Sequence, residues 1–80
     1  MKRSLLDKKK HDLMILERKL QAYARVREVI NSLAAEFRDD PYALEALLSI
    51  DRSIFYQMRM MQQGYVKLKE NIEKMEKQQQ

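Results

Sequence analysis

The chain of 80 residues contains no cysteine and no tryptophan, and it has a single glycine, a single proline and a single histidine. Without cysteine there is no disulfide framework, no thiolate metal site and no thiol nucleophile. Such a low content of glycine and proline is typical of chains built from long helices. Hydrophobic residues make up 45% of the chain and are regularly spaced, which argues against intrinsic disorder. We therefore predict one all-α domain over residues 1–80.

Long hydrophobic runs are also missing. The N-terminal stretch MKRSLLDKKKHD is basic, but its only apolar run is Leu5–Leu6, which is too short for the core of a signal peptide. No stretch approaches the roughly 18 apolar residues of a transmembrane helix. We expect a soluble, unprocessed and cytoplasmic protein without a membrane span.

The residue patterns of known active sites are absent as well. His11 lies between Lys10 and Asp12, and we interpret it as a surface residue and not as a metal ligand. The sequence contains no HExxH motif, no Glu-x-x-His pair and no glycine-rich phosphate loop. Two helices would not enclose a pocket either. We expect no enzymatic activity, no metal, no cofactor and no small-molecule substrate.

The single proline marks a break between two helices. Ser4 and Asp7 have the spacing of a helix N-cap and its partner, and no glycine or proline follows before Phe37. Asp39 or Asp40 can cap a second helix, in which Pro41 suits the first turn because no amide donor is needed there. These signals predict helix one at about 4–37, a turn at about 38–41, helix two at about 41–76 and a frayed tail at 77–80.

Apolar residues recur in alternating steps of three and four, the pattern of a coiled-coil seam. In the first half, where Lys9 and Arg27 interrupt the pattern, the stripe comprises Leu6, Leu13, Leu16, Leu20, Tyr23, Ile30, Ala34 and Phe37. In the second half, where Asp51 interrupts it, the stripe comprises Leu44, Leu47, Ile54, Met58, Met61, Tyr65, Leu68, Ile72 and Met75.

Folding the chain at residues 39–40 brings the two stripes together. Stripe residues whose numbers sum to 77 or 78 then share a layer, and one such layer contains Arg27 and Asp51. A buried charge is costly alone and tolerable when paired. The match predicts an antiparallel helical hairpin in which Arg27 and Asp51 form the ion pair that sets the register.

Further apolar residues flank the two stripes and would lie towards the turn. We predict that six of them form a partner interface: Val26, Val29, Leu33, Leu48, Phe55 and Met60. Ile50 and Tyr56 are weaker candidates. Because two helices provide no third layer to cover such a patch, we expect a four-helix bundle, completed by a second copy or by another helical protein.

Charge is distributed unevenly along the chain, whose net charge is +4. Residues 1–27 carry nine Lys and Arg against three Asp and Glu, whereas residues 28–57 carry two against six. The open end of the hairpin would be basic, and its possible nucleic-acid contacts are Lys2, Arg3, Lys8, Lys9 and Lys10. However, acidic residues interleave with the lysines of helix two, and no aromatic residues accompany the basic cluster to stack on bases.

In its architecture, the predicted hairpin resembles the hairpin co-chaperones of bacterial secretion systems and the secreted WxG proteins. The turn here reads RDDPYA and lacks the tryptophan of the WxG proteins. The sequence favours a non-enzymatic protein–protein interaction module, such as a small adaptor, an assembly factor or a secretion-type chaperone. The alternative is a nucleic-acid-binding regulator of the phage or plasmid type, which would use the basic open end of a hairpin dimer.

Overall fold

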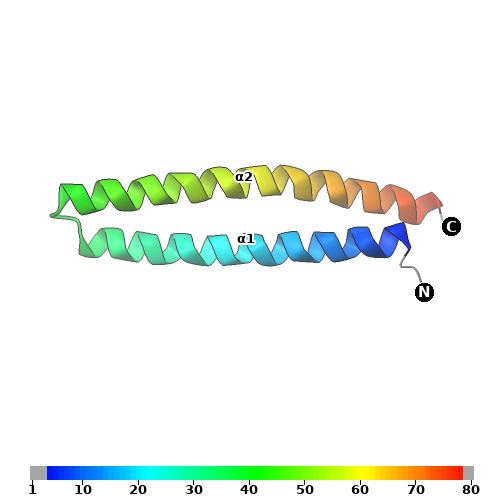
Figure 1. The fold of residues 1–80 in the computed structure, drawn as a ribbon, viewed down its shortest axis with the longest axis horizontal. Coiled ribbons are helices and arrows are strands. Elements are labelled where there is room, and N and C mark those ends of the chain that lie inside the picture. The colour runs from blue at the N-terminus through cyan, green and yellow to red at the C-terminus, as the bar shows by residue number, and fades with distance from the viewer. Residues whose placement is uncertain (1–3, 79–80) are drawn as a thin grey trace.

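Two long helices make up the fold. The computed structural model describes residues 4–78, in which α1 spans Leu5–Glu36 and α2 spans Pro41–Gln78. The helices lie side by side and run antiparallel, so the start of α1 and the end of α2 share one end of the rod (Figure 1). The rod measures 60 × 22 × 15 Å. The predicted all-α class and the packing of two helices against each other are confirmed.

Side-chain caps determine where each helix begins. The backbone N–H of Asp7 donates to the Ser4 hydroxyl at 3.1 Å, which satisfies one of the free donors at the start of α1. At the start of α2, Asp40 Oδ1 accepts from the backbone N–H groups of Tyr42 and Ala43, each at 3.1 Å. Of the two aspartates considered from the sequence, Asp40 is therefore the cap.

The end of α2 lies close to the expected position. The sequence pattern places the end of helix two at about residue 76 with a frayed tail at 77–80, and α2 runs to Gln78. Glu, Lys and Gln are good helix formers, and a lysine in the last turn interacts favourably with the negative end of the helix dipole. Residues 79 and 80 lie outside the described part of the chain.

The core is the seam between the two helices. Apart from Phe37, which follows α1 in the turn, every residue of the two stripes is buried or half-buried, including the three charged interruptions. Within residues 4–78, the buried apolar side chains are Leu6, Ile30 and Ile72. Because each helix buries only one stripe, much apolar surface on the flanks of the seam remains exposed.

The single glycine offers a test of this simple architecture. Gly64 lies inside α2 and has a negative φ, and an added Cβ would meet no heavy atom of the neighbouring described chain within 4 Å. Alanine has the higher helix propensity, so Gly64→Ala should raise the free energy of unfolding by about 1 kcal/mol. The melting temperature followed by circular dichroism should rise by about 4–8 °C. A lower melting temperature would mean that another surface closely approaches Gly64.

Candidate interaction surface

An ion pair links the two helices within the seam. Arg27 Nε donates to Asp51 Oδ1 at 2.9 Å, and Arg27 Nη2 donates to Asp51 Oδ2 at 3.2 Å. Both side chains are partly shielded from solvent, the carboxylate more than the guanidinium. Two parallel hydrogen bonds restrict the relative position of the helices, so this geometry is suited to fix the register.

The pair also shifts the titration of its members. The hydrogen bond from Arg27 lowers the pKa of Asp51, with a smaller contribution from the positive charge, while partial burial acts in the opposite direction. In turn, the hydrogen bond to Asp51 raises the pKa of Arg27. Because the pKa of Asp51 is lower in the folded state, the pair stabilises the fold above about pH 4. This stabilisation is lost as the pH falls through the lowered pKa.

One side of the seam is polar. Seven residues separate Lys10 from Glu17 along α1, and three heptads separate Phe55 from Glu76 along α2, so each pair lies on one strip of its helix. Three contacts link the two helices on this side, two of them made by the seam residues Tyr65 and Arg27: Lys10 to Glu76 at 3.3 Å, the Tyr65 hydroxyl to Glu17 at 2.9 Å, and the Arg27 guanidinium to the Phe55 ring at 4.9 Å. We call this the polar side of the hairpin.

On the polar side, Tyr65 and Arg27 each bind a residue of the other helix. By donating its hydroxyl proton to Glu17, Tyr65 has a raised pKa and remains neutral to a higher pH than a free tyrosine. The guanidinium of Arg27 rests on the Phe55 ring while it binds Asp51, so the aromatic ring supports the ion pair.

The opposite side of the seam has a different composition. Val26 directly precedes Arg27, and Ile50 directly precedes Asp51. Each residue of an α-helix is rotated by about 100° from the one before it. Because the two helices are antiparallel, the residues that directly precede seam residues on α1 and on α2 lie on the same side of the hairpin. This side, which faces away from Phe55, carries no charged residue from Ala22 to Leu33 on α1 or from Ala46 to Met60 on α2. Its members, which we call the uncharged face, are Ala22, Val26, Val29, Leu33, Ala46, Ile50, Ser53, Gln57 and Met60.

A shallow groove extends the uncharged face towards the open end of the rod. Its volume is about 280 Å³, and it is lined by Lys19, Ala22, Tyr23, Val26 and Met61. The first four belong to α1 and Met61 belongs to α2, so both helices contribute to this side of the molecule. The face therefore continues across the seam from one helix to the other.

The predicted interface residues divide between the two sides. Val26, Val29 and Met60 lie exposed on the uncharged face, and Leu33 lies there half-buried. Leu48 and Phe55 are seven residues apart and lie on the polar side instead. The six residues thus do not form a single patch, whereas Ile50, a weaker candidate, lies within the uncharged face.

The predicted basic cluster is less free than its sequence indicates. Lys9 occupies a seam position and is half-buried, and Lys10 pairs with Glu76. Lys8 is exposed. The remaining two candidates, Lys2 and Arg3, lie outside the described residues, so the structure places none of their contacts.

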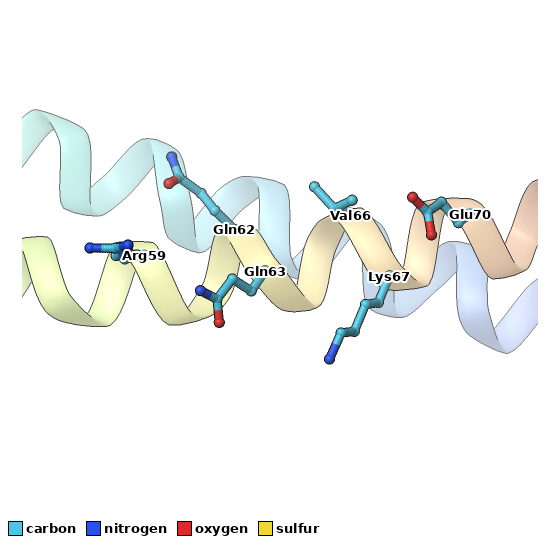
Figure 2. Close-up of a pocket in the computed structure, with 6 residues that line it drawn as sticks. All are labelled: Arg59, Gln62, Gln63, Val66, Lys67 and Glu70. Carbon is cyan, nitrogen blue, oxygen red and sulfur yellow. The ribbon is translucent and has the colours of Figure 1, made fainter.

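A larger surface groove lies on the outer face of α2. It has a volume of about 520 Å³, and its lining residues are Arg59, Gln62, Gln63, Val66, Lys67 and Glu70 (Figure 2). All six come from one helix, and α1 lies behind it (Figure 2). Small-molecule sites usually surround most of their ligand, which one convex helix surface does not do.

The described chain offers few other features from which to argue function. Among residues 4–78, no three His, Asp or Glu side chains gather closely enough to hold a metal ion. Over the same residues, neither helix has an apolar stretch long enough for a membrane crossing. Comparison with protein-family models, with curated proteins and with solved structures found no match to this chain. The uncharged face is therefore the candidate site.

The role of the ion pair in setting the register can be tested by removing one partner or both. Asp51→Ala leaves the Arg27 guanidinium without its carboxylate in a partly buried position, whereas replacing both residues by leucine leaves no charge there. We expect Asp51→Ala to lower the melting temperature more than the double replacement does.

Glu28→Ala is the matched control, since it breaks the exposed ion pair that Arg25 and Glu28 form at 2.8 Å within α1. Exposed pairs contribute little, so this variant should melt close to the wild type. Equal losses in Asp51→Ala and in the double variant would contradict the pairing as a determinant of register.

Proposed function

We propose that this chain is a non-enzymatic protein–protein interaction module that binds a helical partner through the uncharged face. The observation that supports this most is the exposure of large apolar side chains on a face without charge. Val26 is 44% exposed, Val29 47%, Ile50 51% and Met60 52%. Apolar patches of this kind, contiguous and rimmed by polar residues, usually mark interfaces.

The two-helix architecture gives a physical reason for association. A helix layer must bury its apolar stripes against another layer, and this hairpin provides only one layer. A helical partner on the uncharged face would complete a four-helix bundle. Burial would contribute roughly 25 cal/mol for each Å² of apolar surface removed from water. An adaptor, an assembly factor or a secretion-type chaperone would each act in this way.

The alternative proposal, a nucleic-acid-binding regulator, has less support from the described residues. Its basic end would need free cations to contact phosphates. Lys10 is paired with Glu76, and Lys9 is half-buried in the seam. The uncharged face has no comparable internal partner, so we favour association with protein.

Two valine substitutions test the proposal in cells that produce the chain. Val29 lies on the uncharged face and Val66 on the outer face of α2, and the two are similarly exposed at 47% and 53%. Val29→Asp would bury a carboxylate in the interface, whereas Val66→Asp would leave it in water. In native size fractionation, we expect the wild type and Val66→Asp to elute as a complex and Val29→Asp to elute as free chain.

Circular dichroism of both variants serves as the folding control, since the same residue change is made at two exposed helix positions. If Val29→Asp and Val66→Asp elute together, whether both with the wild type or both as free chain, the uncharged face is not the interaction surface.

A further inference from the structure

We propose that the partner on the uncharged face is a second copy of this chain, packed face to face and antiparallel to the first. The inference rests on the proposed function, since it uses the same face and names what covers it. Three features carry it: a second stripe on α1, the residues of α2 at the same level, and the charges at the two ends.

The second stripe of α1 is self-complementary. Its residues follow steps of three, four, three, four and three: Lys19, Ala22, Val26, Val29, Leu33 and Glu36. This is the rhythm of a coiled-coil seam, on a different side of the helix from the seam with α2. If two copies of α1 run antiparallel about a point between Val26 and Val29, residues whose numbers sum to 55 meet. Val26 then meets Val29 of the second copy, and Ala22 meets Leu33.

The same arrangement places opposite charges at the ends of the contact. Lys19 of each copy meets Glu36 of the other, because these numbers also sum to 55. A two-fold axis forms this pair twice, once at each end of the overlap. Lys19 also lines the groove beside Val26, which places its side chain at the edge of the uncharged face.

The residues of α2 that lie level with the two-fold axis are also suited to the contact. Since Arg27 and Asp51 share one level of the hairpin, the point between Val26 and Val29 lies level with Ile50. Ile50 therefore meets Ile50 of the second copy. Ala46 and Ser53 flank it on α2, and their small uncharged side chains allow the two α2 helices to approach each other.

Charge favours the antiparallel over the parallel arrangement. Residues 28–57 carry two basic against six acidic residues and include the turn. Two parallel copies would bring these acidic ends together, whereas antiparallel copies separate them and place Glu36 beside Lys19 of the other copy. Like charges across an interface are unfavourable, and opposite charges select the orientation.

The size of the contact agrees with a reversible dimer. From Lys19 to Glu36 the overlap is about 26 Å long at 1.5 Å per residue. With the 22 Å width of the rod, each copy contributes roughly 600 Å², which is at the lower end of specific interfaces. We therefore expect a concentration-dependent equilibrium between monomer and dimer.

A charge-exchange series tests the partner and the orientation together. Sedimentation equilibrium of the purified full chain is measured over a concentration series for the wild type, Lys19→Glu, Glu36→Lys and the double variant. Each single change sets two like charges against each other at both ends, so the dissociation constant should rise by about threefold to thirtyfold. The double variant restores opposite charges and should return to within about twofold of the wild type. Lys74→Glu, which lies beyond the overlap, should leave the constant unchanged.

The outcomes separate this inference from the proposed function. If the purified wild type stays monomeric while Val29→Asp still abolishes the complex in cells, the second copy is not the partner and the interaction surface remains valid. If the chain dimerises but the double variant fails to recover, or Lys74→Glu weakens the dimer equally, the antiparallel register is wrong. If Val29→Asp also changes nothing in cells, both proposals are overturned.

Discussion

The two hydrogen bonds between Arg27 and Asp51 hold α1 and α2 at one level and in one rotation. The other features of the surface follow from this constraint. With the pair in the seam, Phe55 lies beneath the guanidinium on one side, and Val26 and Ile50 lie together on the other. A slip by one residue would turn each helix by about 100° and would mix charged and apolar residues on both sides. In our proposal, this partly buried ion pair sets the register and with it the surface that a partner would meet.

The two sides of the hairpin differ in how far their side chains are partnered within the hairpin. On the polar side, Lys10, Glu17 and Arg27 each have partners on α2, although Leu48 and Phe55 remain about half exposed. On the uncharged face, valine, isoleucine and methionine side chains are about half exposed, and no residue of the described chain covers them. The proposed association through this face would supply the second layer that two helices lack. Self-association has the additional merit that the charged residues at the ends of the stripe, Lys19 and Glu36, have opposite signs.

Much of the fold could be predicted because helix caps and seam spacing are local, one-dimensional signals. Pro41 with its preceding aspartates located the turn, and the shared layer of Arg27 and Asp51 followed from counting outwards from it. The division of the interface could not be found in this way. Leu48, Phe55 and Val26 are all next to a seam residue. Whether such a residue lies on the polar side or on the uncharged face depends on how each helix is rotated about its own axis. The sequence did contain the distinction between the two sides. Val26 directly precedes the seam residue Arg27, whereas Phe55 lies four residues after the seam residue Asp51. The half-buried position of Lys9, by contrast, follows from its place in the first stripe.

The most direct test of the account uses the absence of cysteine from the chain, because any disulfide must then form at an introduced residue. Ile50→Cys places one thiol on the proposed two-fold axis, where the two Cα atoms would lie within the roughly 7 Å that a disulfide requires. Under mild oxidation we expect Ile50→Cys to form a covalent dimer rapidly, while Val66→Cys, which is equally exposed but on the outer face of α2, stays largely monomeric. Equal cross-linking of the two variants, or none at residue 50, would contradict the pairing of two copies through the uncharged face.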